Sequence, residues 1–203
     1  VTGIPAYSTL GWFDDPVLNT VMRYSDAQLA GLIFHELAHQ VVYVPGDTVF
    51  NESFAVAVEM EGVDRWLARN GDAAKRADYE LAEQRKGAFI DLVMKYRDSL
   101  RTMYADAASD AEKRQKKAET FAAMKAQYQT LKSSWGGYAG YDRYFAQDLN
   151  NAHLVPVATY SELVAGFRRV LAENGGDFKR FYAAVREIAK LPKEQRQAKL
   201  KAG

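Results

Sequence analysis

The chain has no cysteine among its 203 residues. This absence excludes disulfide bonds, a thiolate nucleophile and any zinc site built on cysteine ligands. The net charge is only +1, so there is no basic field of the kind that attracts nucleic acid. The apolar run Leu29 to Phe34 is far too short to cross a bilayer. We therefore expect no nucleic-acid partner and no transmembrane segment in this chain.

Hydrophobic residues make up 48% of the chain, enough for a globular fold with a real core. Aromatic and β-branched residues predict a strand in the N-terminal segment Ala6 to Phe13. A capping box over Ser25 to Gln28 predicts a helix from Asp26 to about Val44, which Pro45-Gly46 would end. A second helix is predicted over Val49 to Asn70.

Two long stripes of apolar residues at helical spacing follow, from Tyr79 to Met103 and from Ala118 to Trp135. They predict an antiparallel helical hairpin, with a capping box at Ser109 to Glu112 starting the returning helix. Beyond the glycine-rich "WGGYAGY" we expect further helices over residues 141–151, 161–174 and 177–189, a loop around Pro156, and a fraying basic tail over residues 193–203.

Two histidines and a glutamate crowd the short stretch "FHELAHQ". His35 and His39 are four residues apart, so on a helix both imidazoles reach the same side. Glu36 is rotated by about 100° from His35 on such a helix and can stand beside a shared ion without ligating it. The spacing also arises by chance in ordinary amphipathic helices, but burying three polar side chains without partners is costly. We predict that His35 and His39 bind one zinc ion and that Glu36 is the catalytic base.

A catalytic zinc site needs a third protein ligand and an open position. The nearby acids are Asp47, Glu52, Glu59 and Glu61. The first helix overshoots His39 by about 7–8 Å, and an antiparallel second helix would bring Glu52 back nearly level with it after about 6 Å. Glu59 lies two turns farther, where it is placed to orient a ligating histidine. We predict Glu52 as the third zinc ligand.

Peptide hydrolysis also needs a donor for the oxyanion that forms on the attacked carbonyl. The candidates that follow the glycine-rich loop are Tyr141, Tyr144, His153 and Tyr160. The ordinary alternative is that the tyrosines are amphipathic core residues with a wet hydroxyl. We select His153, the only histidine outside the motif, and Tyr144 as the candidate catalytic donors.

The pairing of "FHELAHQ" with "FNESFA" resembles the gluzincin zinc metallopeptidases, which combine an HExxH helix with a glutamate from the next helix. Together with "YSTLGWFDDP", "LNNAHL" and "TYSELVAGF", these stretches are most similar to the bacterial putative aminopeptidase family. The resemblance implies zinc on His35, His39 and Glu52, Glu36 as base, and a zincin-like fold with Ala6 to Phe13 at the cleft edge. Family members are longer at the N-terminus and often resemble envelope lipoproteins. The resemblance therefore implies a processed chain from the bacterial envelope or periplasm.

The sequence differs in two respects from better known zinc metallopeptidases. Thermolysin-like enzymes carry an aspartate four residues after the ligand glutamate, where this chain has Val56. The glycine-x-methionine-glutamate-asparagine motif with which well-known aminopeptidases hold the substrate amine is absent. The aminopeptidase activity is thus implied by the family resemblance alone, and an endopeptidase of the same mechanism stays open.

These patterns together predict a mainly helical α+β fold with a zincin-like core and a protruding helical hairpin. The expected parts of this single domain are a catalytic core (residues 1–71), the hairpin (72–135) and a C-terminal helical part completing the cleft (136–203). The hairpin is either a simple structural insertion or a surface for docking a partner. The predicted function is a zinc-dependent peptidase acting on peptide or protein substrates. The competing class is a non-catalytic helical interaction protein that binds zinc.

Overall fold

The computed structural model describes residues 24–201. Within that range every regular element is a helix, and no strand occurs. The prediction of an α+β fold is therefore wrong: the fold is all-helical over the described residues. Beyond residue 24, apolar side chains recur at intervals of three and four, which favours helices. The predicted strand, based on the aromatic and β-branched residues of Ala6 to Phe13, lies outside the described residues.

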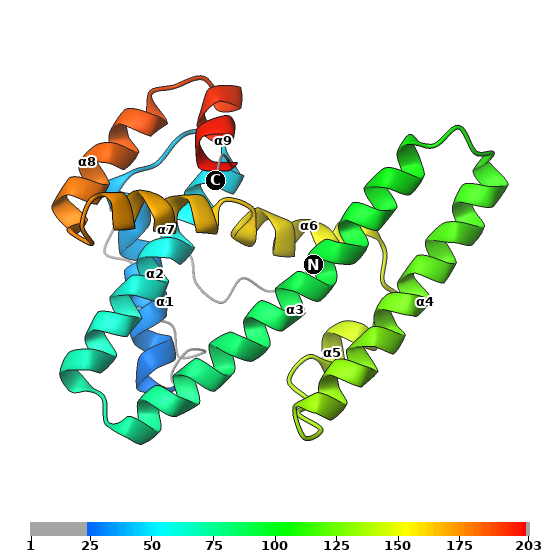
Figure 1. Ribbon diagram of the computed structural model, residues 1–203, viewed down its shortest axis with the longest axis horizontal. Coiled ribbons are helices and arrows are strands. Elements are labelled where there is room, and N and C mark those ends of the chain that lie inside the picture. The colour runs from blue at the N-terminus through cyan, green and yellow to red at the C-terminus, as the bar shows by residue number, and fades with distance from the viewer. Residues whose placement is uncertain (1–23, 202–203) are drawn as a thin grey trace. The chain divides into compact units, whose positions relative to one another are not determined.

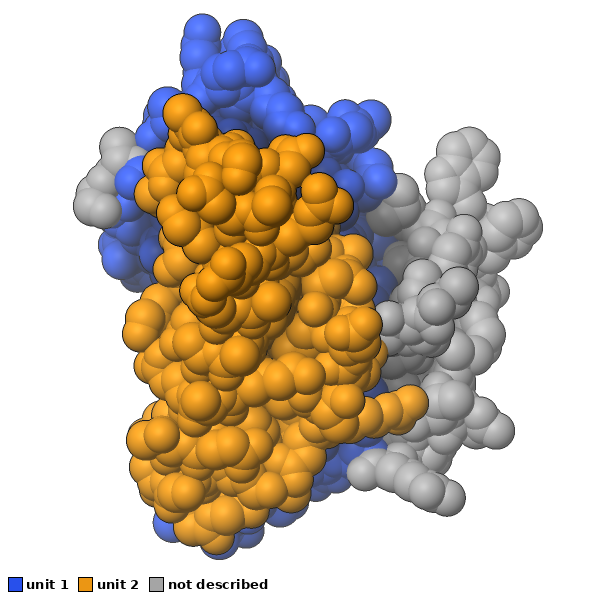
Figure 2. Space-filling model, turned by 90° about the vertical axis from the view of Figure 1, so that its right-hand side faces the viewer, with its two compact units in different colours: residues 1–79, 159–203 blue, residues 80–158 orange. Residues whose placement is uncertain are grey.

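The chain divides into two compact units, coloured separately in Figure 2. One unit comprises residues 1–79 with 159–203, and the other comprises residues 80–158. The divisions fall within two helices, α3 (Ala73–Ala105) and α6 (Asn151–Ser161). The sequence-based parts of residues 1–71, 72–135 and 136–203 stay a prediction.

Helices α1 (Asp26–Val41) and α2 (Thr48–Asn70) lie side by side in the first unit (Figure 1). The predicted capping box is present: Ser25 accepts a hydrogen bond from the Gln28 backbone, and the Gln28 side chain accepts one in return. A Cβ atom on Gly62 would lie 2.6 Å from Phe34 Cδ2, so only glycine permits this crossing. The close approach sets the histidine-bearing face of α1 against α2.

The turn between α1 and α2 is held by the side chain of Asn51. Its Oδ1 accepts from the Val44 backbone N–H at 2.8 Å, and its Nδ2 donates to the Val44 carbonyl at 2.9 Å. Gly46 has a φ of 78°, which favours glycine, and Asp47 caps α2. Helix α1 ends at Val41, earlier than predicted, because the backbone is already extended at Val42. These contacts set the register of α2 beside α1.

Helices α7 (Val164–Glu173), α8 (Phe178–Ala189) and α9 (Lys193–Lys201) complete the first unit. Four buried phenylalanine rings form the centre of its core and stack edgewise or at a tilt: Phe50, Phe54, Phe167 and Phe181.

The prediction that the C-terminal tail frays is wrong. It forms α9, where Arg196 is buried and its Nη2 lies 2.8 Å from Asp47 Oδ2. The guanidinium also donates to the carbonyls of Ala189 and Leu191. The basic composition of the tail suggested a solvated segment, but one arginine anchors it to the N-terminus of α2.

The second unit contains the predicted helical hairpin, formed by α3 and α4 (Asp110–Ser134). Leu92, Met124 and Tyr128 are buried between the two helices and pack with Phe145 of the short helix α5 (Asp142–Phe145). The helix predicted over residues 141–151 is therefore wrong beyond this single turn. Helix α6 instead occupies the region predicted as a loop, and Pro156 lies inside it.

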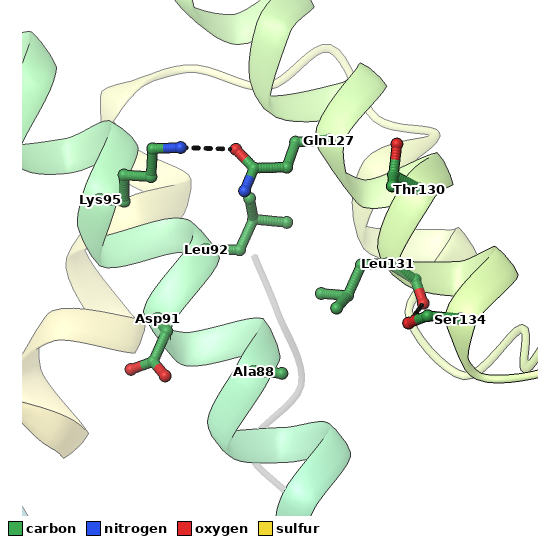
Figure 3. Close-up of a pocket in the computed structure, with 8 residues that line it drawn as sticks. All are labelled: Ala88, Asp91, Leu92, Lys95, Gln127, Thr130, Leu131 and Ser134. Carbon is green, nitrogen blue, oxygen red and sulfur yellow. Dashed lines mark hydrogen bonds between the residues drawn. The ribbon is translucent and has the colours of Figure 1, made fainter.

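A shallow groove of about 350 Å³ lies between α3 and α4 (Figure 3). Leu92 and Leu131 line it together with Ala88, and Lys95 Nζ donates across it to Gln127 Oε1 at 2.9 Å. Its lining contains a single acid and no histidine, so it offers no metal site. None of the described helices is long and apolar enough to cross a membrane.

Candidate metal centre

His35, His39 and Glu52 meet where α1 and α2 cross. Nε2 of His35 lies 3.2 Å from Glu52 Oε2, and Nε2 of His39 lies 3.7 Å from the same oxygen. One ligand atom from each residue lies within 4.8 Å of the other two. The imidazole rings are 5.1 Å apart and nearly perpendicular. The predicted ligands are thus brought together, with the carboxylate returning on α2 nearly level with His39.

The spacing of these atoms fits a tetrahedral metal ion. With zinc–ligand bonds of about 2.1 Å, neighbouring ligand atoms in a tetrahedron lie about 3.4 Å apart. The two distances to Glu52 Oε2, 3.2 and 3.7 Å, bracket that value. Two imidazoles and one carboxylate also form the ligand set of open catalytic zinc sites. His35, His39 and Glu52 are therefore residues that could hold a divalent metal ion.

Glu59 lies about two turns after Glu52 on α2 and orients the ring of His35. Its Oε2 lies 3.1 Å from Nδ1 of His35, so the ring is held at both nitrogens by carboxylates. Burial alone would lower the pKa of His35, but the hydrogen bonds and negative charges of Glu52 and Glu59 outweigh it and raise the pKa to about 9. In the metal-free protein this imidazole is therefore protonated at neutral pH.

His39 has a different environment. Burial and the neighbouring His35 lower its pKa, and Glu52 offsets this only in part. Its Nδ1 is buried and has no hydrogen-bond partner among the residues that the structure describes. Burial would raise the pKa of Glu52, but the hydrogen bond from His35 and the charges of both histidines lower it. Glu52 is thus ionised and His39 neutral, the states in which both bind a metal.

Tyr160, near the C-terminal end of α6, lies over His35. Its ring stacks on the imidazole at 6.1 Å and 24°, and its hydroxyl hydrogen-bonds to Glu52. Burial, the charge and hydrogen bond of Glu52 and the charge of Glu36 raise its pKa to about 12. The hydroxyl therefore stays protonated and able to donate at neutral pH.

Sequence reasoning named Tyr160 among four donors but did not select it. No feature of the sequence distinguished Tyr160 from the other tyrosines, since the contact with His35 depends on how the helices pack. The selected residues, Tyr144 and His153, lie in the second unit. There Tyr144 Oη donates to the backbone carbonyl of His153 at 3.1 Å, and Nδ1 of His153 accepts from the Asn150 backbone N–H. Both side chains already have local hydrogen bonds at the start of α6.

Two histidines one helical turn apart, a carboxylate from the antiparallel helix and a second glutamate beside them define a helical protein with a cluster suited to a divalent metal ion. The family described as "Putative aminopeptidase" matches residues 1–200, and the chain belongs to that family. Neither a curated protein nor a solved structure matches the chain.

Proposed function

We propose that the protein is a zinc-dependent peptidase, and that the aminopeptidase family to which it belongs describes its substrate class. One observation carries the proposal: the Nε2 atoms of His35 and His39 both approach Glu52 Oε2, at 3.2 and 3.7 Å. The Glu52 carboxylate is partly buried, and withdrawing a carboxylate from water is costly unless it is paired or coordinates a metal. Glu59, which faces Nδ1 of His35, also supports a metal site. Histidines that bind a metal usually donate the N–H of their other ring nitrogen to a carboxylate.

Zinc held by these three residues would lower the pKa of a water molecule and polarise the scissile carbonyl. Glu36 lies next to His35 on α1 and is not one of the three ligands. In the proposed mechanism its carboxylate accepts the proton of the attacking water and returns that proton to the leaving amine. Glu59 keeps His35 oriented throughout, because its Oε2 faces Nδ1, the ring nitrogen that does not bind the metal.

Tyr160 is the proposed donor to the oxyanion. Its hydroxyl lies beside Glu52, and its raised pKa of about 12 keeps the proton on the oxygen. A developing negative charge on the carbonyl oxygen would attract this hydroxyl away from the carboxylate. We assign this role to Tyr160 in preference to Tyr144 and His153, which have local partners in the second unit.

The test combines metal analysis with a peptide-library digest. Purified without chelators, the protein should contain one zinc ion per chain, and cleavage should stop in chelator and return with zinc. Peptides with a free amino terminus should lose their first residue, whereas acetylated copies should be spared. Internal cleavage of the acetylated peptides would make the protein an endopeptidase instead. Bound zinc without cleavage of any peptide would favour the non-catalytic interaction protein.

A further inference from the structure

The break between α6 and α7 contains a hydroxyl from a different helix. Helix α6 ends at Ser161 and α7 begins at Val164. The Oγ atom of Ser53, on α2, accepts a hydrogen bond from the Leu163 backbone N–H at 3.2 Å and donates to the Thr159 carbonyl at 3.5 Å. Ser53 is fully buried, with 0% of its surface exposed.

The two backbone groups that Ser53 contacts are those that an unbroken helix would pair with each other. In an α-helix the N–H of one residue bonds to the carbonyl four residues earlier, which for Leu163 is Thr159. The Ser53 hydroxyl lies between them and bonds to both. Insertion of a side chain into the backbone ladder is a recognised cause of sharp helix bends. Ser53 therefore satisfies the backbone of the interruption between the two helices, residues 159–164, the α6–α7 corner.

This break begins two residues after Tyr160, and Ser53 comes immediately after Glu52. Successive residues on a helix point about 100° apart, so α2 directs Glu52 toward the histidines and Ser53 toward the α6–α7 corner. The same turn of α2 thus contributes a metal ligand and an anchor for the backbone that carries Tyr160. The Tyr160 ring reaches His35 and its hydroxyl reaches Glu52 from this corner.

We infer that Ser53 is a positioning residue, which holds Tyr160 over His35 and Glu52 by its two hydrogen bonds to the α6–α7 corner. The inference rests on the proposed role of Tyr160 as the oxyanion donor. Ser53 touches neither substrate nor metal in this assignment, so its effect on catalysis passes through Tyr160. Other contacts also stabilise the backbone of this corner, since Leu163 and Phe167 are buried in the core of the same unit. Ser53→Ala should therefore fold.

A double-mutant cycle tests whether Ser53 acts through Tyr160. Ser53→Ala should lower kcat by about tenfold and Tyr160→Phe by about a hundredfold, with zinc content unchanged in both. The combined variant should be no slower than Tyr160→Phe alone, because an anchor has no effect once the anchored hydroxyl is gone. Ser99→Ala is the matched control: Ser99 is an exposed serine of α3 whose hydroxyl also bonds a backbone carbonyl.

Two measurements on the metal-free protein do not depend on activity. Exchange of the Leu163 amide hydrogen should accelerate by at least roughly tenfold in Ser53→Ala, because its acceptor is lost. The NMR contact between the Tyr160 and His35 rings should weaken in the same variant. Neither should change in Ser99→Ala.

The inference is overturned if Ser53→Ala retains full kcat and the ring contact, or if its kcat loss multiplies with that of Tyr160→Phe. A failure of the proposed function has a different signature. Glu36→Gln would then hydrolyse peptides like the wild type, or no variant would have measurable activity. In that case the exchange rate of Leu163 and the Tyr160–His35 contact still decide whether Ser53 positions the tyrosine.

Discussion

Nδ1 of His35 and Oε2 of Glu59 lie 3.1 Å apart, although they belong to different helices and are 24 positions apart in the chain. The contact leaves Nε2 of the same ring directed at Glu52. It therefore determines both the orientation of the imidazole and the nitrogen that faces the centre. A ligand prepared in this way loses little entropy on binding a metal.

Replacing Glu59 should weaken metal binding. Glu59→Ala removes the partner of Nδ1, and loss of such a contact typically reduces affinity by about 10–100-fold. Glu59→Gln keeps an acceptor oxygen at the same place and should cause a smaller loss. Zinc affinity measured by competition with a chromophoric chelator checks this order. Equal affinities in all three proteins would show that Glu59 does not prepare His35.

The stability of the metal-free protein should fall as the pH rises from about 6.5 to about 9. The pKa of His35 is raised from its ordinary value of 6.5 to about 9 in the folded protein. Below pH 6.5 both the folded and the unfolded chain are protonated, and the stabilisation is fully present. Between the two values only the folded state keeps the proton, so the free energy of unfolding declines.

Urea titrations at several pH values measure this decline in the free energy of unfolding. His35→Asn, which cannot take up the proton, should remove the part of the slope that belongs to His35. Zinc affinity should change in the opposite direction over the same range, because binding at Nε2 displaces that proton. A pH-independent zinc affinity from 6.5 to 9 would contradict the raised pKa.

Glu36→Gln should abolish most of the catalysis while leaving the metal in place. The amide is nearly the same size as the carboxylate but cannot accept a proton from water, and loss of a general base typically lowers kcat by about 10²–10⁴-fold. Zinc content and the unfolding midpoint serve as controls. Loss of zinc in this variant would assign Glu36 to the ligand set instead.

Tyr160→Phe should lower kcat by about 10²–10³-fold, the usual effect of removing one oxyanion donor. The KM of small peptides and the zinc affinity should change little, because Glu52 keeps both of its histidine neighbours. Tyr144→Phe is the matched comparison and should retain most of the activity. If instead Tyr160→Phe mainly loses zinc, the hydroxyl serves to orient Glu52.

Arg196→Met should destabilise the fold strongly although it lies in the last helix. The substitution leaves the Asp47 carboxylate buried without its guanidinium partner, which typically costs about 3–5 kcal/mol. The control is Lys190→Met, which removes an exposed ion pair with Glu187 and should cost at most about 1 kcal/mol. Both values follow from urea unfolding curves. A small cost for Arg196→Met would mean that α9 contributes little to stability.

Short-range patterns predicted the elements around the centre well. The Ser25 capping box, the turn at Gly46 and the hairpin helices all depend on contacts between residues close in sequence. The same local logic placed Glu52 level with His39, because helix rise and turn length are nearly constant. The local patterns gave wrong predictions where contacts between residues far apart in the sequence determine the secondary structure. Pro156 predicted a loop, yet a helix forms there, and the tail became a helix anchored by a buried ion pair.

The sequence alone predicted that two histidines and a returning acid would lie together, because four-residue spacing and a short turn leave few other arrangements. Only the tertiary structure decided that the described fold is all-helical and that Tyr160, rather than a residue of the second unit, lies over His35. That choice depends on Ser53, more than a hundred positions earlier, bonding to the backbone of the α6–α7 corner. Contacts at such separation leave no periodic trace in the sequence, since they depend on how helices pack.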